Sequence, residues 1–209
     1  MFGIHHFGLF LAAGILLNLT PGPDTAYILG RSIAEGREAG VASALGIGMG
    51  SIFHTCAAAL GLSAVLATSA FAFSTIKLVG GAYLMFLGIK MLLDHKQQLS
   101  LPSNFRRRTT IATFHQGVLT NVLNPKVALF FLAFLPQFID PASGTKVFAF
   151  LFLGLTFVTT GTIWCLILAW FASAFSKRLR TNPTVAQWLN RTTAALFVFL
   201  GVRLATVKQ

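Results

Sequence analysis

Long apolar runs separated by short polar stretches make up most of this chain. A helix that crosses a bilayer needs about 20 mostly apolar residues, and strands are usually far shorter than these runs. The pattern therefore predicts an all-α integral membrane protein with about six transmembrane helices. The segments expected to span are 5–33, 40–66, 71–93, 111–138, 146–175 and 185–206.

Proline and polar residues interrupt the first and the fourth of these segments. The first contains Asn18-Leu-Thr-Pro21-Gly22-Pro23-Asp24, and the fourth contains Asn121-Val-Leu-Asn124-Pro125-Lys126. Proline removes a backbone donor and breaks the helix, and an unsatisfied backbone group at membrane depth costs several kcal/mol. We therefore expect both breaks to be buried in protein or to line a wet cavity.

Two internal matches indicate that one three-helix unit is used twice. The sequence from Gly14 to Asn18 resembles that from Gly117 to Asn121, and Phe86-Leu-Gly-Ile-Lys90 resembles Phe199-Leu-Gly-Val-Arg203. A unit with an odd number of spans must lie in the membrane in opposite orientation to its copy. Such inverted repeats with broken helices bind substrate near the midplane. The single transmembrane domain, 1–209, is expected to divide into repeat one at 1–95, a cytoplasmic basic loop at 94–110 and repeat two at 111–209.

The composition excludes a soluble domain, because 55% of the residues are hydrophobic, 10% are charged and the mean hydropathy is +0.75. A net charge of +11 could suggest nucleic-acid binding, but that function needs a basic face on a soluble module. The excess of Lys and Arg in cytoplasmic loops explains it instead. With six spans, eleven of these residues fall on one face: Arg31, Arg37, Lys90, Lys96, Arg106, Arg107, Arg108, Lys177, Arg178, Arg180 and Arg191. Four fall on the other: Lys77, Lys146, Arg203 and Lys208.

This bias predicts a multi-pass protein of the cell inner membrane, with both termini outside the cytoplasm. The charges between Arg31 and Glu38 are expected to form a solvated turn. The basic loop 94–110 could also bind anionic lipid or a partner, although topology alone explains its charge.

Asp24 and Lys126 are the charged residues that fall well inside the expected spans, each directly after a helix break. A charge at the centre of a spanning helix costs about 2.5 to 3.5 kcal/mol on insertion scales, so each must be compensated. One interpretation is a structural ion pair that holds the two repeats together. The other is a substrate site, in which Lys126 and half-helix amides bind a carboxylate while Asp24 binds an ammonium group or carries a coupling proton. Opposite charges close together suit a zwitterion such as an amino acid.

Other polar residues inside the spans have two interpretations each. His54 could carry a proton or be a hydrogen-bonded packing residue, and Asn18, Asn121 and Asn124 could satisfy broken backbone or contact substrate. The threonines at 156, 159, 160 and 162 could line a pore or bond their own helix. Gly46 and Gly50 form a GxxxG pattern that allows a homo-oligomer, although packing within the bundle is favoured. Cys56 and Cys165 are expected to be free packing residues.

In combination, these motifs resemble the LysE/RhtB family of amino-acid exporters. The resemblance covers nearly the whole chain and also includes Gly80-Gly-Ala-Tyr83-Leu and Phe134-Leu-Pro-Gln-Phe138. It implies a plasma-membrane exporter of about six spans, driven by the proton motive force, for amino acids or derivatives such as homoserine, homoserine lactone, threonine, leucine or lysine. The family motifs correspond here to Pro21, Gly22, Pro23, Asp24, Asn121, Asn124, Pro125 and Lys126.

Three alternatives come from other classes. An intramembrane enzyme is not supported, because the sequence has no HExxH, no GxSxG and no cluster of acidic residues for a metal. A metal-cation exporter would have few ligands, with one acid inside the spans and two separated cysteines. A non-transporting assembly subunit would need Asp24 and Lys126 for its abundance only. No cofactor and no resident metal are expected.

Overall fold

The structure is a computed structural model that describes residues 2–68, 70–93 and 108–172, together with residues 188, 191, 192, 194, 195, 198, 199 and 202. In these residues the fold is helical, and one antiparallel bridge between Ile4 and Ile139 is the one extended pairing. Most of the basic loop 94–110 and of the expected span 185–206 lies outside the described residues, as does most of the match between Phe199 and Arg203.

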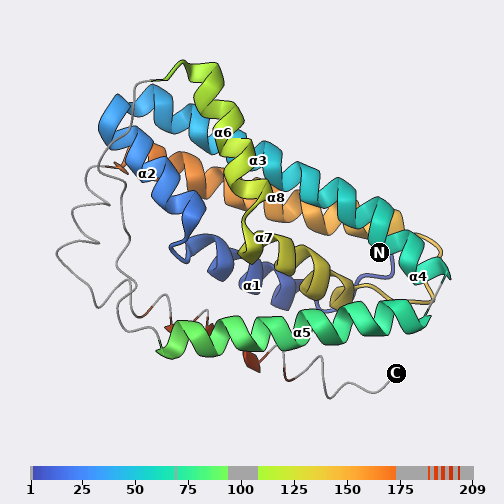
Figure 1. The fold of residues 1–209 in the computed structure, drawn as a ribbon. Helices are drawn as coiled ribbons and strands as arrows, with labels where there is room; N and C mark the ends of the chain where they lie inside the picture. The colour runs from blue at the N-terminus through green and yellow to red at the C-terminus, as the bar shows by residue number, and fades with distance from the viewer. Residues whose placement is uncertain are drawn as a thin grey trace.

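The first five expected segments are all helical. Their elements are α1 (Phe7–Leu19), α2 (Pro23–Glu35), α3 (Arg37–Ala57), the π-helical η1 (Ala58–Leu62), α4 (Ser63–Thr68), α5 (Ala70–Leu93), α6 (Thr110–Val122), α7 (Pro125–Leu129), the π-helical η2 (Phe130–Phe134), the 3-10 helix η3 (Leu135–Phe138) and α8 (Lys146–Trp170). Figure 1 shows that α3 and α8 run side by side as the long axis of the molecule, while α5 follows its opposite edge.

Two continuous helices in the described residues are long and apolar enough to cross a membrane, Arg37–Val65 and Lys146–Trp170. A third span results if Thr110–Val122 and Pro125–Phe138, which are bent by 48° at their break, are taken together. The first expected segment consists of two helices of 13 residues each, because Pro21 and Gly22 separate α1 from α2. The structure is thus that of a helical membrane protein, and it does not establish six spans.

Both helix breaks lie where the prolines predict them. Thr20 and Gly22 have extended backbone between α1 and α2, and Pro23 is the first residue of α2. In the fourth segment, Asn124 caps α7, because its Oδ1 accepts a hydrogen bond of 3.0 Å from the main-chain nitrogen of Lys126. Proline suits the first position of a helix because the N–H that it lacks would have no partner there.

Glycines bring α3 and α6 into close contact. A Cβ built on Gly46 would lie 2.2 Å from the main-chain oxygen of Phe114, and one on Gly117 would lie 2.8 Å from that of Ser43. Gly50 meets Asn121 in the same way, at 2.8 Å from its Cβ. The prediction that Gly46 and Gly50 pack within the bundle is confirmed.

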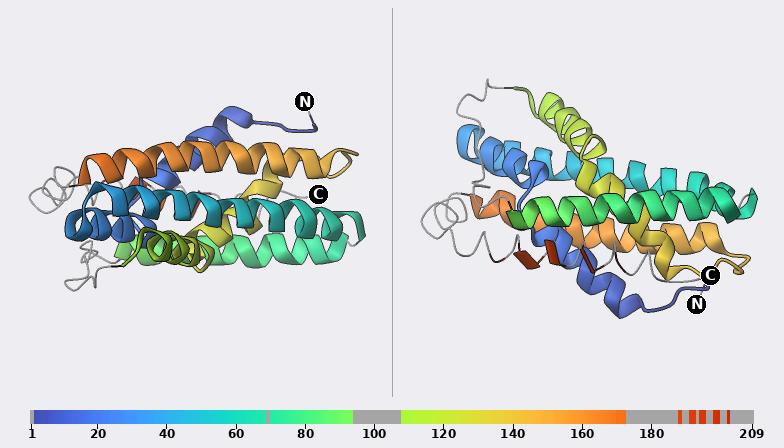
Figure 2. Two further views of the ribbon diagram at one scale, coloured as in Figure 1. Left: turned by 90° about the horizontal axis from the view of Figure 1, so that it is seen from above. Right: turned by 60° about the horizontal axis from the view of Figure 1, so that its bottom comes forward.

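Hydrogen bonds show which segments share an end of the molecule. The N-terminal segment joins the end of η3 through two main-chain hydrogen bonds. The main-chain nitrogen of His5 donates to the oxygen of Phe138 at 3.0 Å, and that of Asp140 donates to the oxygen of Gly3 at 2.9 Å. At the opposite end, Glu35 accepts a hydrogen bond from the main-chain nitrogen of Arg108 at 3.1 Å. Figure 2 shows the N-terminus and the start of α8 at the same end of the molecule.

The prediction of a solvated turn from Arg31 to Glu38 is wrong in its first half. Arg31 is 3% exposed and lies within α2, where it forms an ion pair with Glu35 one helical turn later. Its other terminal nitrogen donates to Gln116 of α6 at 2.9 Å. Burial is tolerated because Glu35 neutralises the guanidinium and both of its terminal nitrogens have hydrogen-bond partners, and Gln116 lies too far along the chain for the sequence to reveal it.

Two apolar clusters fill the interior. The first contains a stack of phenylalanines from α1, η2, η3 and α8, including Phe10, Phe130 and Phe134. The second lies nearer the other end and joins Ile28 of α2 and Ile47 of α3 with α8. The polar residues of the two helix breaks lie between these clusters.

Candidate functional site

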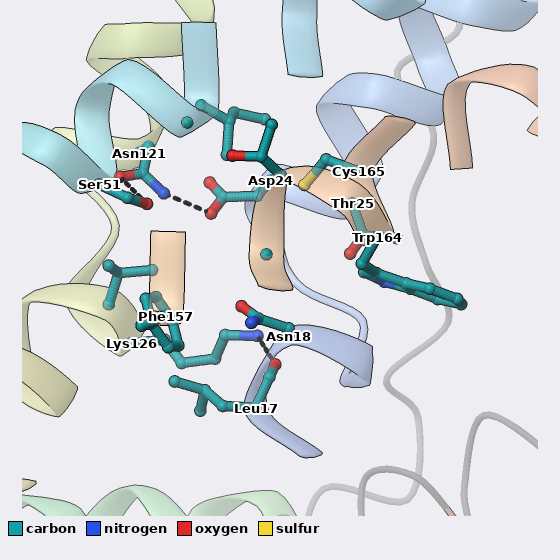
Figure 3. A pocket seen from close by; sticks show the side chains of 15 residues that line it. Leu17, Asn18, Asp24, Thr25, Ser51, Asn121, Lys126, Phe157, Trp164 and Cys165 are labelled. Carbon is teal, nitrogen blue, oxygen red and sulfur yellow. Dashed lines mark hydrogen bonds between the residues drawn. The ribbon is translucent and has the colours of Figure 1, made fainter. Parts of the chain in front are cut away.

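A small polar cavity lies where the two helix breaks meet α3 and α8 (Figure 3). Its volume of about 30 Å³ is enough for one or two water molecules, since one water needs about 10 to 15 Å³ of such space. Side chains from both apolar clusters line it, with Leu17 and Phe157 from the first and Ile47 and Cys165 from the second. The polar lining residues are Asn18, Asp24, Thr25, Ser51, Asn121, Lys126 and Thr162.

Asp24 lies in the first turn of α2 and faces the break between α6 and α7. Its Oδ2 accepts a hydrogen bond of 2.8 Å from Nδ2 of Asn121, whose Oδ1 accepts one of 3.2 Å from Ser51. The other carboxylate oxygen, Oδ1, is buried and has no donor within hydrogen-bond distance among the described residues, although the Asn124 side chain lies close enough to stabilise the charge of Asp24. A buried oxygen without a partner costs about 1 to 3 kcal/mol, so Oδ1 is an acceptor available to a ligand.

Lys126 lies at the start of α7, and its side chain reaches across to the end of α1. Its Nζ donates hydrogen bonds to the main-chain oxygens of Leu17 at 3.0 Å and Thr20 at 2.9 Å. The last carbonyls of a helix have no partner in their own helix. Lys126 therefore satisfies the backbone that the first helix break leaves open.

Asp24 and Lys126 line one cavity but form no ion pair with each other in the described part of the chain. Each lies instead against a helix end of opposite sign. Asp24 is in the first turn of α2, which carries the positive end of the helix dipole, and the Lys126 ammonium is at the C-terminal, negative end of α1. Such placements stabilise a charge by about 0.3 to 2 kcal/mol.

The asparagines each satisfy polar groups near the breaks. Asn18 donates from Nδ2 to the hydroxyl of Thr160 on α8 at 3.4 Å. Asn124 is 2% exposed and caps α7, while its Nδ2 is buried with no partner among the described residues. Of these two residues, Asn18 lines the cavity and Asn124 does not.

The threonines of α8 separate into two groups. Thr156, Thr159 and Thr160 donate to main-chain oxygens of their own helix at 2.8 to 3.0 Å. Thr162 alone of the four lines the cavity, where its buried hydroxyl has no partner among the described residues and faces Gly48 of α3. A pore-lining role is thus compatible with the position of Thr162.

Several predicted site residues lie beside the cavity and not in its wall. The ring of His54 stacks on Phe131, and its Nε2 is 3.2 Å from the main-chain oxygen of Asn121. Pro23 and Pro125 are exposed residues that begin helices. Pro21 forms part of the first break, and the backbone of Gly22 passes so close to Lys126 that an added Cβ would lie 3.4 Å from Nζ.

Thr25, Phe157 and Trp164 also line the cavity, although no motif marked them in the sequence. Thr25 follows Asp24 directly, but α8 meets the site only through tertiary packing. Cys165 is free and buried, as expected, and it lies in the cavity wall as well. The described residues contain no group of three His, Cys, Asp or Glu side chains that could hold a metal ion.

Residues 15–208 match the family model described as LysE type translocator. A protein of Vibrio cholerae described as an uncharacterized membrane protein is 30% identical, over 98% of both chains. A protein of Klebsiella pneumoniae named leucine efflux protein is 28% identical, over 100% of this chain and 98% of its own. A protein of the same name from an Enterobacter species is 26% identical, over 99% and 98% of the two chains. No solved structure matches significantly.

Proposed function

The chain belongs to the family of LysE type translocators, and from this premise we propose that it exports amino acids across the cell inner membrane in exchange for protons. As a translocator it is a transporter and not an enzyme. The observation that carries the substrate class is the cavity at the paired helix breaks, which holds one unpaired carboxylate oxygen and one ammonium group. An amino acid has one group complementary to each.

In this proposal, the substrate's ammonium group binds Oδ1 of Asp24, and its carboxylate is neutralised by Lys126. The remaining wall accepts the side chain of the substrate and is mostly apolar, with Ile47, Phe157 and Cys165. Among the residues that the structure describes, the lining contains no second carboxylate that could neutralise a basic side chain. The proposed substrates are therefore neutral amino acids, and the names of the leucine efflux relatives agree with this choice.

A cavity of about 30 Å³ cannot hold an amino acid, so the site must open for transport. The cavity lies between the two apolar clusters, and transport would widen it by moving them apart. The six-span, inverted-repeat architecture with both termini outside supplies the motion, since one repeat can rock against the other around a fixed site. The 13-residue helices α1 and α6, each followed by a break and a proline-initiated helix, support the repeat.

Proton coupling would use the same carboxylate. Asp24 can bind either a proton or the substrate's ammonium group at Oδ1, so the two compete and their fluxes are opposed. His54 bonds the main-chain oxygen of Asn121, the residue that holds Asp24, and it is a nearby titratable side chain that would supply the proton once the site opens.

The test is transport by the purified protein in liposomes. With an imposed pH gradient, we expect movement of labelled leucine, homoserine or threonine that exceeds movement of lysine. Transport of divalent metal ions with no movement of any amino acid would replace the proposal with a metal-cation exporter. Movement of neither, by folded protein, would favour a non-transporting assembly subunit.

A further inference from the structure

The ammonium group of Lys126 occupies a site made of main-chain oxygens. Its Nζ lies 3.0 Å from the oxygen of Leu17 and 2.9 Å from that of Thr20, at the C-terminal end of α1. These carbonyls carry the negative end of the helix dipole, and the oxygen of Leu17 also accepts a long hydrogen bond of 3.3 Å from the main-chain nitrogen of Thr20. The end of α1 is thus a cation site, and in this structure it is filled by a side chain of the protein itself.

The same cavity contains a second cation acceptor, the unpaired Oδ1 of Asp24. The cavity leaves space for only one or two water molecules, at about 30 Å³, while the Lys126 side chain is inside it. An amino acid therefore cannot enter unless Lys126 withdraws from the end of α1. The entering ammonium group has the same charge and the same donors as the one that leaves.

We propose that Lys126 is a tethered substitute for the substrate's ammonium group. In the substrate-free protein its Nζ satisfies the end of α1. When substrate enters, the substrate's ammonium group takes over the cation-binding region between these carbonyls and Asp24, and the displaced Lys126 turns to the substrate carboxylate. This role rests on the proposed export function and extends it.

The consequence concerns the return of the empty transporter. With Lys126 present, the substrate-free site keeps a cation at the end of α1 and can close and reopen to the other side. Without Lys126, the buried Asp24 carboxylate and the negative end of α1 would lose the cation that stabilises them unless substrate is bound. Such a protein would change between its two access states only with substrate bound. It would therefore exchange substrate across the membrane without net export.

The experiment compares two kinds of efflux from liposomes loaded with the labelled amino acid that the wild type transports best, at equal pH on both sides. Net efflux is measured into buffer without substrate, and exchange is measured into buffer with the unlabelled amino acid. For Lys126→Gln we expect net efflux to fall about tenfold or more, the change that losing one charge-assisted hydrogen bond corresponds to. Both fluxes are measured at saturating amino acid, because losing the contact between Lys126 and the substrate carboxylate should raise the KM in either mode, and the maximal rate of exchange should then fall much less than the maximal rate of net efflux.

Two controls separate charge from side-chain replacement. Lys126→Arg keeps a cation and should retain both kinds of efflux. Lys146→Gln removes a lysine at the start of α8, away from the cavity, and should change neither. Methylammonium, added to Lys126→Ala as a free cation of the same chemistry, should restore part of the net efflux.

An equal fall in the maximal rates of net efflux and exchange for folded Lys126→Gln would overturn the proposal, because Lys126 would then act on the loaded protein and have no separate role in the empty one. Retention of both would overturn it too and leave Lys126 as a structural cap of α1. If Lys126→Gln does not fold, Lys126→Met, which keeps the length of the side chain, serves in the same comparison. If the proposed export function itself is wrong, the result can be told apart, because the wild type would then move no amino acid by net efflux or by exchange.

Discussion

At the scale of single residues, the site is defined by polar atoms that the protein leaves without partners. Three threonines of α8 bond their own helix, whereas the buried hydroxyl of Thr162 faces the cavity and bonds no described residue. Oδ1 of Asp24 is likewise buried, with no donor within hydrogen-bond distance among the described residues. A buried polar atom without a partner destabilises the fold, and an apolar side chain in its place would not. Both atoms are therefore as expected of groups that are retained to bind a ligand.

Replacing Thr162 by valine should therefore weaken transport without weakening the fold. Because the hydroxyl has no partner to lose, we expect unchanged or slightly raised thermal stability, by up to about 1 kcal/mol. The KM for the transported amino acid should rise, which concentration-dependent uptake into liposomes measures. The matched control is Thr159→Val, which changes an exposed threonine that bonds its own helix. An unchanged KM for Thr162→Val would show that its hydroxyl does not contact substrate.

The sequence alone was sufficient to identify which residues carry charge inside the expected spans. It could not show how each charge is compensated. Asn121 holds Asp24 from 97 positions away, and Lys126 bonds main-chain oxygens that any residue type would offer. The sequence left open a direct ion pair between Asp24 and Lys126. In the described residues the two side chains form no direct ion pair, but they line one cavity and each charge stabilises the other.

At the scale of helices, the site depends on how closely α3 approaches α6. Ser51 reaches Asn121 because Gly46, Gly50 and Gly117 let the two backbones nearly touch. The positions of the helix breaks follow from proline and are predictable. The two π-helical segments, Ala58–Leu62 and Phe130–Phe134, are not, because no residue type marks them and they contact each other only in the folded chain.

A larger residue at Gly46 should separate these helices. A Cβ there would lie 2.2 Å from the main-chain oxygen of Phe114, which cannot move aside as a side chain could. We expect Gly46→Val to lower the free energy of unfolding by about 3 kcal/mol or more, measured by thermal unfolding in detergent. The control is Gly61→Ala in η1, where an added Cβ meets no atom within 4 Å. Equal stability of the two variants would contradict the close approach of α3 and α6.

The buried ion pair at the end of α2 gives a second prediction for the helices. Arg31 joins Glu35 of its own helix and Gln116 of α6. Glu35→Gln should destabilise the protein by about 3 kcal/mol, because it leaves a buried charge without its partner. Removing both charges, with Arg31→Met and Glu35→Leu, should cost less than Glu35→Gln alone. A double variant less stable than the single one, by the same unfolding measurement, would mean that the pair itself stabilises the fold.

At the scale of the whole molecule, two sets of contacts mark its opposite ends. Residues 2–5 join 138–140 at one end, and Glu35 joins Arg108 at the other. These contacts fit the alternation of spans expected from the sequence, although most of the sixth segment lies outside the described residues. Our proposal for which end faces the cytoplasm rests on the eleven-to-four distribution of Lys and Arg.

Labelling of single cysteines in intact cells tests this orientation. With Cys56 and Cys165 replaced by alanine, Gly144→Cys should react with a membrane-impermeant maleimide from outside, because residue 144 is exposed at the end that we assign to the exterior. Glu38→Cys should react only after the cells are permeabilised. The reverse pattern would invert the topology and place both termini in the cytoplasm.

The central claim is that the cavity at the two helix breaks is the site through which amino acids pass. The most direct measurement is proton-gradient-driven amino-acid transport in liposomes by Asp24→Asn, compared with the wild type and with Glu38→Gln, which removes an exposed acid. The amounts of folded protein must be equal. We predict that Asp24→Asn loses transport, since Oδ1 then lacks the charge that binds ammonium or proton, while Glu38→Gln transports normally. Transport by Asp24→Asn at the wild-type rate would contradict the assignment of this cavity.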